Sequence, residues 1–264
     1  MQSNNKKTII KCLGWATLTI GIIILVSILI CLRMSIVTDH FYHALVKDPV
    51  RNAPVGNNLV SPADGTVMYI KRIKDGILPD VVKRNVPIPL SELIKNDSID
   101  PIKNGYLIGI YMNIESVHIT RVPIDAKYVK QIVFNGPHMS MDKQEKAVIL
   151  TKLVPGLVTI KKLLGIEPFS IEKHGDYILK SARETSIFKD VRDTYVYVIR
   201  IADYAIGNIL TWIQQGRNVK KGQKMGMITW GSQVDICFEN TDGLEIKVKE
   251  GDYVYAGETI LAAY

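Results

Sequence analysis

The stretch Gly216-Arg-Asn-Val219-Lys-Lys-Gly222-Gln-Lys-Met225 returns 35 residues later as Gly251-Asp-Tyr-Val254-Tyr-Ala-Gly257-Glu-Thr-Ile260. The two stretches share both glycines, the valine and the apolar residue at the end. Each predicts a strand, a tight turn at glycine and a second strand, because glycine adopts backbone conformations that other residues avoid. Two such units so close together indicate a compact β-sandwich with two similar halves.

The segment between the two units, Gly226-Met-Ile-Thr-Trp-Gly-Ser-Gln-Val-Asp235, contains a Gly-Ser pair. Apolar residues lead into Gly231-Ser232. An alternating pattern leads out of it and places Val234, Ile236 and Phe238 on one face of a strand. By itself such a pair marks an ordinary turn, and a turn serine is the simplest interpretation of Ser232.

The rest of the chain predicts further strands and few helices. The 19 glycines and 11 prolines favour turns over long helices. Strand patterns occur within residues 59–70, 106–113, 126–135 and 194–201. Ser91-Glu-Leu-Ile-Lys95 predicts a short helix capped by Ser91. We therefore expect a mainly β (α+β) sandwich with a few short helices and repeats that resemble the hammerhead of lipoyl and biotinyl domains.

From Cys12 to Leu32 the sequence holds 21 consecutive uncharged residues, bounded by Lys11 and Arg33. A helix of this length spans about 31 Å, which matches the hydrocarbon core of a bilayer. The run is longer than the apolar part of a cleaved signal peptide, and no small-residue cleavage site follows it cleanly. We expect an N-terminal segment (1–40) with a membrane helix at about 12–32, followed by one folded domain at 41–264. Basic residues on the two sides balance, so the side of the membrane stays open.

Two segments have a less decided structure. Residues 41–54 contain prolines that deny a long helix and indicate an extended path into the domain. Residues 143–166 mix leucine, isoleucine and lysine around Pro155-Gly156. They fit either two helices packed on the core or a segment that lies on the bilayer surface.

The charge balance favours an anionic partner. The 33 Lys and Arg residues exceed the 26 Asp and Glu residues, which gives a formal net charge of +7. Anionic lipid and nucleic acid both attract such a charge. Because the basic residues occur as dispersed pairs, we do not expect nucleic acid binding. Three cysteines cannot form a disulfide framework, and no CxxC or HExxH spacing offers a metal site.

Three separated residues could carry chemistry: Asp64 in an Asp-Gly turn, His118 after a strand, and Ser232. A serine, a histidine and an aspartate can act in nucleophilic chemistry when the fold brings them together. Each also has a structural interpretation. Asp64 forms a turn with Gly65, and a histidine such as His118 is commonly a hydrogen-bonded core residue.

Seven stretches from Val46 onward carry a resemblance to a known family: Lys47-Asp-Pro-Val-Arg51-Asn-Ala-Pro54, Ser61-Pro-Ala-Asp-Gly65, Tyr111-Met-Asn-Ile-Glu-Ser-Val-His118-Ile-Thr-Arg-Val-Pro123, Ile201-Ala-Asp-Tyr-Ala-Ile-Gly-Asn-Ile209, Gly222-Gln-Lys-Met-Gly-Met-Ile228, Gly231-Ser-Gln-Val-Asp235 and Val248-Lys-Glu-Gly-Asp-Tyr-Val-Tyr-Ala-Gly257. In content and order they resemble the phosphatidylserine decarboxylase family. Its members are pyruvoyl-dependent enzymes that mature by self-cleavage.

The resemblance implies that Ser232 attacks the carbonyl of Gly231 and divides the chain into residues 1–231 and 232–264. The resulting ester eliminates to a dehydroalanine, which hydrolyses to a pyruvoyl group and ammonia. This cofactor, derived from Ser232, condenses with the amine of phosphatidylserine and draws off the electron pair released with carbon dioxide. The resemblance implies that the protein binds phosphatidylserine in the membrane and that its two cleaved fragments bind each other. Whether the chain forms a homo-oligomer stays open.

The resemblance also suggests roles for single residues. Asp64 and His118 are candidates for the base and the proton carrier, with His118 as proton donor because its unperturbed pKa lies near neutrality. Arg121 stands where some members have a second histidine, and it could neutralise the substrate phosphate or carboxylate. The family's Asn-Glu-Arg stretch is missing around Arg183-Glu-Thr-Ser186, and Gly207-Asn208 replaces an arginine pair. The headgroup pocket therefore departs from the family pattern.

The sequence thus predicts a membrane-anchored, self-processing enzyme that converts phosphatidylserine to phosphatidylethanolamine. Two alternatives remain. One is a relative that acts on another amino-bearing lipid. The other is a non-enzymatic anchored β-sandwich, such as a carrier or adaptor domain. A carrier requires an exposed lysine at a hairpin tip, and Lys224-Met225 is a poor match for it.

Overall fold

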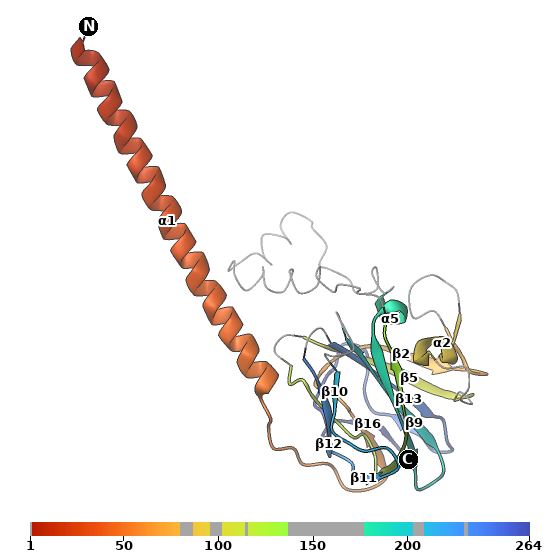
Figure 1. The fold of residues 1–264 in the computed structure, drawn as a ribbon. Helices are drawn as coiled ribbons and strands as arrows, with labels where there is room; N and C mark the ends of the chain where they lie inside the picture. The colour runs from red at the N-terminus through yellow and green to blue at the C-terminus, as the bar shows by residue number, and fades with distance from the viewer. Residues whose placement is uncertain are drawn as a thin grey trace. The chain divides into compact units, whose positions relative to one another are not determined.

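The computed structural model describes residues 2–79, 87–95, 102–113, 116–136, 177–202, 209–229 and 232–264. The chain divides into two compact units, one with the N-terminal helix up to Tyr42 and the other with most of the chain from His43. Each unit is described by itself. The second unit is mainly β with few helices, as predicted (Figure 1). The prediction for residues 143–166 lies outside the described residues.

The elements of the second unit follow one another along the chain as β1 (Asn58–Val60), β2 (Gly65–Ile73), β3 (Ile77–Leu78), β4 (Ile88–Pro89), α2 (Leu90–Ile94), β5 (Gly105–Met112), β6 (Ile119–Arg121), β7 (Ala126–Phe134), α5 (Tyr177–Lys180), β8 (Arg183–Asp190), β9 (Tyr195–Ala202), β10 (Ile209–Thr211), β11 (Asn218–Val219), β12 (Lys224–Ile228), β13 (Ser232–Glu239), β14 (Glu245–Ile246), β15 (Tyr253–Val254) and β16 (Ile260–Ala263). The longer strands form an eight-stranded sheet in the order β11-β7-β8-β9-β13-β5-β2-β15. Shorter strands form the sheets β1-β16-β14 and β10-β12-β6, and the hairpin β3-β4.

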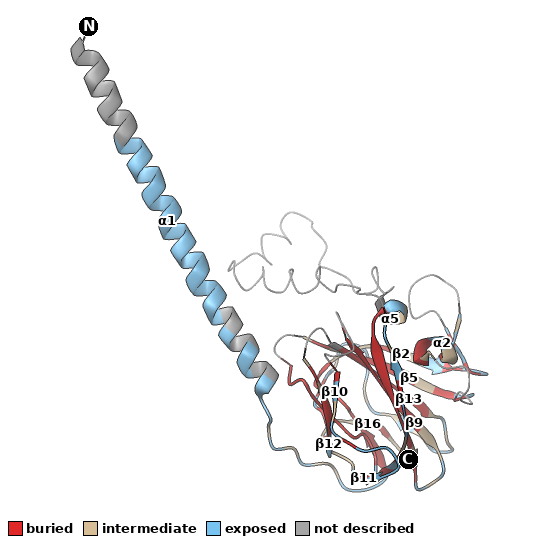
Figure 2. Ribbon diagram, in the orientation of Figure 1, coloured by how far each residue is buried: buried red, intermediate tan, exposed pale blue. Residues whose placement is uncertain are grey.

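One face of the eight-stranded sheet packs against the two three-stranded sheets, and the buried core lies between them (Figure 2). Alternate residues of β13 enter this core, because successive side chains of a strand point to opposite faces. The predicted face of Val234, Ile236 and Phe238 is confirmed, since all three are fully buried there. Leu59 and Met225 contribute to the same cluster from the small sheets. Burial of this apolar surface holds the layers together.

The opposite face of the large sheet is covered by α2 and the hairpin β3-β4. Leu90, Leu93 and Ile94 of α2 join a second buried cluster there, which also includes Cys237 of β13. The short helix predicted at 91–95 is confirmed with a shift of one residue, but the cap is wrong. Ser91 lies inside the helix, and the N-cap position belongs to a proline without a side-chain hydrogen bond.

The large sheet reads the same from both edges when β11 is matched with β15, β7 with β2, β8 with β5, and β9 with β13. The strands β6 and β7 repeat the lengths of β1 and β2, 61 residues further along the chain. The ladder β2-β5 shifts register between Val67 and Tyr69, and the ladder β7-β8 shifts at the equivalent place, between Tyr128 and Lys130. The predicted pair of similar halves is therefore confirmed, and the repeat extends over the whole sheet.

The halves exchange equivalent backbone hydrogen bonds. The N–H of Val60 donates to the carbonyl of Pro123 at 2.9 Å, and the N–H of Arg121 donates to the carbonyl of Pro62 at 2.8 Å. The segments that contain β1 and β6 therefore run antiparallel to each other. Residues that follow Pro62 lie beside residues that precede Arg121.

The two halves are not consecutive in the chain. One half consists of β6 to β12, and the other consists of β1, β2, β5 and β13 to β16. The chain therefore crosses between the halves twice, between β5 and β6 and again between β12 and β13. Because Met112 at the end of β5 pairs with Ser232 at the start of β13, both crossings leave or reach the large sheet at the same end.

The first unit contains α1 up to Tyr42; the whole helix runs over Gln2–Val46, 45 residues. Its stretch Gly14–Ile36 has a mean hydropathy of 2.6 and is long and apolar enough to cross a membrane, a property shared by signal sequences near the N-terminus. The predicted apolar helix is confirmed, but the extended path from residue 41 is wrong for 41–46. The helix ends before Pro49, as expected because the residue ahead of proline avoids helical geometry. Residues 47–54, called the linker below, form neither helix nor strand within that range.

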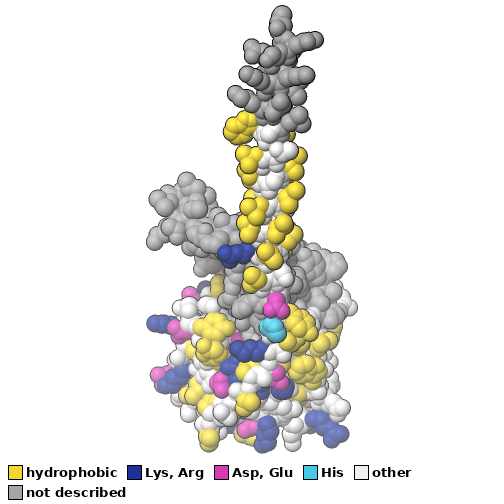
Figure 3. Space-filling view, turned by 90° about the vertical axis from the view of Figure 1, so that its left-hand side faces the viewer, with side chains coloured by type: hydrophobic (Ala, Val, Ile, Leu, Met, Phe, Trp, Pro, Cys, Tyr) yellow, Lys and Arg dark blue, Asp and Glu magenta, His cyan; other side chains and the backbone are white. Residues whose placement is uncertain are grey.

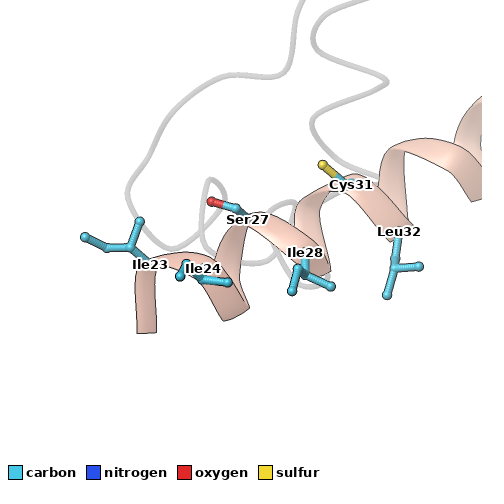
Figure 4. A pocket seen from close by; sticks show the side chains of 6 residues that line it. All are labelled: Ile23, Ile24, Ser27, Ile28, Cys31 and Leu32. Atoms are coloured by element: carbon cyan, nitrogen blue, oxygen red, sulfur yellow. The ribbon is translucent and has the colours of Figure 1, made fainter. Parts of the chain in front are cut away.

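Apolar side chains cover the described part of α1 (Figure 3). Six side chains on successive turns line a hollow on its surface: Ile23, Ile24, Ser27, Ile28, Cys31 and Leu32 (Figure 4). The lining is almost wholly apolar and comes from one helix.

The glycine turns of the repeat generate a test of the twofold packing. Gly251 and Gly257 both have positive φ, +93° and +77°. A Cβ at Gly251 would meet nothing within 4 Å, whereas one at Gly257 would lie 2.9 Å from Cδ of Arg121 and 3.3 Å from Cα of Gly222. We expect Gly251→Ala to lower the free energy of unfolding by about 1–2 kcal/mol through backbone strain. Gly257→Ala should cost about 1–3 kcal/mol more through crowding.

Denaturant unfolding of both variants in the full-length Ser232→Ala chain, solubilised in detergent, measures the difference. Equal losses for the two variants would contradict the close packing of the two glycine turns.

Candidate functional site

Ser232 occupies the first position of β13, in the middle of the large sheet. Its backbone is aligned with Met112 of β5 on one side and with Ala202 of β9 on the other. The chain before it is described up to Thr229, so Gly231 lies outside the described residues. Because β13 is paired on both sides, a cut before Ser232 would leave the strand in the sheet.

His118 lies directly before β6, at the crossing between the halves. Its side chain is 3% exposed, and Nδ1 lies 2.7 Å from the carbonyl of Ser116. The N–H of Ile228 donates to the carbonyl of His118 at 3.2 Å, so His118 lies opposite the end of β12. Burial lowers the pKa of His118 to about 4, and the bond with Ser116 opposes this only in part. The imidazole is therefore neutral at pH 7. The expectation that His118 has a pKa near neutrality, on which its role as proton donor was based, does not hold.

Asp64 lies in the turn between β1 and β2 and is 2% exposed. Its Oδ1 accepts a hydrogen bond from the N–H of Ala256 at 2.7 Å. Its Oδ2 accepts one from Nη2 of Arg51, also at 2.7 Å. Burial raises the pKa of Asp64, whereas the bond from Ala256 and the charge of Arg51 lower it. The turn predicted here is present, with its carboxylate bound on both oxygens.

The fold brings Asp64, His118 and Ser232 to one end of the large sheet. Thr66 of β2 pairs with Tyr111 of β5, and Tyr111 pairs with Gln233 of β13, so Asp64 lies at the end where β13 begins. His118 precedes Arg121, in a segment antiparallel to the one in which Asp64 follows Pro62, so it lies at the same end.

Tyr253 of β15 connects the surroundings of Asp64 and His118. Its backbone pairs with Thr66 of β2, and its hydroxyl lies 3.2 Å from Oγ of Ser116. Burial raises the pKa of Tyr253, and the charge of Asp64 adds to the rise. Tyr253 therefore lies within electrostatic reach of Asp64 and touches the loop that carries His118.

Arg121, expected to bind substrate, is buried and bound within the protein. Its Nη1 donates to the carbonyl of Gly222 at 2.9 Å. Its Nη2 donates to Oδ1 of Asp48 at 3.2 Å and to the carbonyl of Pro49 at 3.1 Å. These contacts attach the linker to a glycine turn of the repeat. A role for Arg121 in substrate binding stays a prediction.

A buried ion pair fixes the strand that leads to the candidate cleavage point. Glu184 of β8 and Arg200 of β9 are 2.5 Å apart and almost completely buried. Nη1 of Arg200 also donates to the carbonyl of Leu210 in β10 at 2.9 Å. A Cβ at Gly226 of β12 would lie only 2.2 Å from this nitrogen. The pair thus connects the large sheet with β10 and β12, in the region where the family's Asn-Glu-Arg stretch is missing.

A second buried polar group lies on the other face, three residues after Ser232. The hydroxyl of Tyr69 donates to Oδ2 of Asp235 at 2.8 Å, and Nε2 of Gln233 donates to Oδ1 of Asp235 at 2.7 Å. A Cβ at Gly109 would lie 2.3 Å from the ring of Tyr69, so only glycine lets the ring cross β5 to reach Asp235. Burial raises the pKa of Asp235 to about 6. This network fixes the register of the first residues of β13 against β5 and β2.

Sequence reasoning did not single out Arg51, Glu258 or Tyr253. Arg51 and Tyr253 occur inside stretches that carried the resemblance, and Glu258 directly follows one. Their contacts appear only when the linker, β2 and the last hairpin come together in the fold. Within the described part of the chain, no group of three or more His, Cys, Asp or Glu side chains is placed to hold a metal ion.

Comparison with known proteins identifies a family over most of the chain. A family model described as phosphatidylserine decarboxylase matches residues 37–262. The chain is 30% identical to a Methanocaldococcus jannaschii protein named as a candidate archaetidylserine decarboxylase proenzyme, over 89% of this chain and 93% of that protein. It is 27% identical to the phosphatidylserine decarboxylase proenzyme of Ehrlichia canis, over 96% of this chain and 84% of the relative. For the proenzyme of Geotalea uraniireducens the identity is 26%, over 97% of both chains.

The burial of His118 predicts how stability depends on pH. Between pH 6.5 and pH 4 the imidazole of His118 binds a proton in the unfolded chain but stays neutral in the folded chain. The free energy of unfolding therefore decreases as the pH is lowered over this range, by up to about 3 kcal/mol. We expect His118→Gln to lose less stability over this range than the parent, both compared in the Ser232→Ala chain. Urea unfolding at several pH values measures the slopes, and parallel curves would contradict the neutral buried imidazole.

Proposed function

The chain belongs to the phosphatidylserine decarboxylase family, and we propose that it is a self-processing enzyme that decarboxylates a serine phospholipid. The observation that carries the proposal is that the turn of Asp64 and the loop of His118 lie at the end of the large sheet where β13 begins with Ser232.

In the proposed maturation, the hydroxyl of Ser232 loses its proton to a base and attacks the carbonyl carbon of Gly231. The peptide C–N bond breaks and an ester forms. Elimination then releases the carboxylate of Gly231 and leaves a dehydroalanine, and one water converts this to a pyruvoyl group with loss of ammonia. No outside oxidant or reductant is needed.

A neutral His118 fits the role of base in this step, because a protonated imidazole could not accept the proton of Ser232. Asp64 supplies a fixed negative charge at the same end of the sheet. In the second reaction, the decarboxylation, His118 would return a proton to the substrate carbon, which requires that an anionic substrate favours the protonated imidazole.

The surroundings of Ser232 suit a cofactor made from the chain itself. The strand β13 is paired on both sides, so the new end of the small fragment would be held in a fixed place between β5 and β9. The pyruvoyl group supplies an electrophilic carbonyl that takes up the electron pair released with carbon dioxide. The small fragment would contain residues 232–264, which form β13 to β16.

Phosphatidylserine is the proposed substrate, and phosphatidylethanolamine the product. The helix α1, used as a single membrane span, and the formal charge of +7 both suit an anionic lipid that stays in the bilayer. The similarity to a protein named for archaetidylserine supports that lipid as a second candidate. The serine headgroup is common to both lipids.

A carrier domain on the same repeat is less well supported. Lys224, at the turn where a carrier would present its modified lysine, forms an ion pair with Asp48. A carrier would also have no use for the buried arrangement around Asp64.

Self-cleavage is the first prediction of the proposed function. The expressed chain should yield two fragments on a denaturing gel, and the intact mass of the small fragment should equal residues 232–264 less one ammonia. The Ser232→Ala chain should stay whole. The large fragment's mass also tells whether α1 is retained, as a membrane span requires.

An uncleaved parent chain with the same gel pattern as Ser232→Ala would refute the enzyme. If cleavage occurs, release of carbon dioxide from phosphatidylserine vesicles, compared with archaetidylserine and phosphatidylcholine vesicles, identifies the lipid.

The twofold fold offers a matched control for Asp64. Asp125 occupies the equivalent turn, and its Oδ1 accepts the N–H of Lys221 at 3.0 Å, as Oδ1 of Asp64 accepts that of Ala256. We expect Asp64→Asn to slow self-cleavage by a factor on the order of 10² to 10⁴, the usual effect of losing an acid–base group. Asp125→Asn should cleave like the parent chain. Pulse–chase labelling gives both rates. Similar slowing in the two variants would mean that Asp64, like Asp125, has only a structural role in its turn.

A further inference from the structure

The linker is bound to the β-rich unit at several points, although it forms no helix or strand. Asp48 accepts a hydrogen bond from Arg121 and forms an ion pair with Lys224. Further along, the N–H of Asn52 donates to Oε1 of Glu258 at 3.1 Å. The path of the linker is therefore set by contacts with β6, β12 and the last hairpin.

Arg51 is the linker residue that enters the candidate site. Its Nη2 donates to Oδ2 of Asp64 and its Nη1 to Oε2 of Glu258, both at 2.7 Å. The guanidinium lies 5.3 Å from the centre of the Tyr255 ring. With 8% of the side chain exposed, this is a forked, partly desolvated contact of two charge-assisted hydrogen bonds, one to each of two carboxylates, and such bonds are stronger than those between neutral groups.

Charged and titratable groups face Asp64 from four elements: Arg51 from the linker, Arg121 from β6, Tyr253 from β15, and Glu258 from the turn before β16. Of the two cations, Arg121 directs its Nη1 and Nη2 to the carbonyl of Gly222 and to the linker. Glu258 is negative and opposes ionisation of Asp64. Arg51 is thus the cation in direct contact with the buried carboxylate, which would otherwise be costly to keep charged.

The equivalent turn in the other half shows what the fold itself requires. Asp125 keeps the hydrogen bond to the backbone, but its side chain is more than half exposed. Its ion pair with Lys220 is 3.9 Å long. The position equivalent to Glu258 is occupied by Gln223. The turn therefore needs only the aspartate, and the fork of Arg51 is an addition at the end that contains Ser232.

We infer that Arg51 is a positioning residue for self-cleavage. It holds Asp64 as a correctly oriented carboxylate and makes the linker part of the site. The inference rests on the proposed function and deepens it. Asp64 belongs to residues 1–231 and Glu258 to residues 232–264, so the same fork joins the two fragments after the cut.

The test measures the pH profile of self-cleavage. The full chain is synthesised in a cell-free system with liposomes, and the chase is run from about pH 5.5 to about pH 9. We expect Arg51→Met to slow cleavage by about tenfold or more at pH 7, and to move the acid limb of the profile up by about one pH unit or more, because Asp64 then holds its proton to higher pH. Arg51→Lys, which keeps the charge without the fork, should lie between Arg51→Met and the parent.

Arg192→Met is a matched control at the opposite end of the sheet. Arg192 donates to the buried Asp190 at 2.6 and 2.8 Å and lies 3.4 Å from the ring centre of Tyr264. Like Arg51, it binds a buried aspartate and lies against a tyrosine ring, but it contacts one carboxylate where Arg51 contacts two. Its loss should lower the melting temperature but leave the rate and pH profile of cleavage unchanged.

The outcomes separate the two proposals. A parent chain that does not cleave refutes the proposed function. A parent that cleaves, with an unchanged rate and profile in Arg51→Met, overturns the inference alone. Loss of cleavage at every pH in both Arg51→Met and Arg51→Lys also overturns it, since the charge would then restore nothing. A slowed reaction that recovers at high pH, with partial rescue by lysine, supports it.

Discussion

In each half of the large sheet, an aspartate carboxylate accepts a hydrogen bond from the backbone N–H that precedes a left-handed glycine. Asp64 accepts from Ala256, and Asp125 accepts from Lys221. Each contact ties the turn after a short strand to a hairpin that comes much later in the chain. Asp64 is buried, so loss of this contact would leave its Oδ1 and the amide of Ala256 without a partner, which costs more than an ordinary hydrogen bond contributes. Asp125 is more than half exposed, so its contact contributes less. The two contacts fasten the turns after β1 and β6 to the turns before β16 and β12, and so help to hold the small sheets over the large one.

The order of the strands explains why a cut before β13 is compatible with the fold. After such a cut, β13 would still pair with β5 and β9, β15 with β2, and β16 with β1. All of these ladders join residues 232–264 to the larger fragment. The buried network of Tyr69, Gln233 and Asp235 adds side-chain contacts across the same boundary. The two fragments would therefore stay together through ordinary sheet pairing and core packing, without a covalent link.

Much of the strand framework was predictable from the sequence, because period-two patterns and glycine turns are local signals. The buried face of β13 and the repeat of the glycine hairpins were found in this way. The repeat of β1-β2 in β6-β7 was not, since the two stretches share little more than Pro62 with Pro123 and Asp64 with Asp125. Candidate site residues could be chosen from their chemistry and family resemblance. Their electrostatics could not, because the pKa of His118 depends on burial, and the partner of Asp64 arrives from a linker whose path only the folded chain defines.

The twofold fold has two equivalent ends, and only one of them carries the candidate site. At the far end, β8 continues into β9 through the short turn 191–194. At the near end, the equivalent strands β5 and β13 are not joined, because the other half is inserted between them. Two crossings replace one turn there: one presents His118 and the other holds the bond proposed for cleavage. The insertion therefore brings the loop that carries His118 and the first residue of a central strand to the same end of the sheet. At the far end, where a simple turn joins β8 and β9, the equivalent aspartate Asp125 is more than half exposed and binds the amide of Lys221.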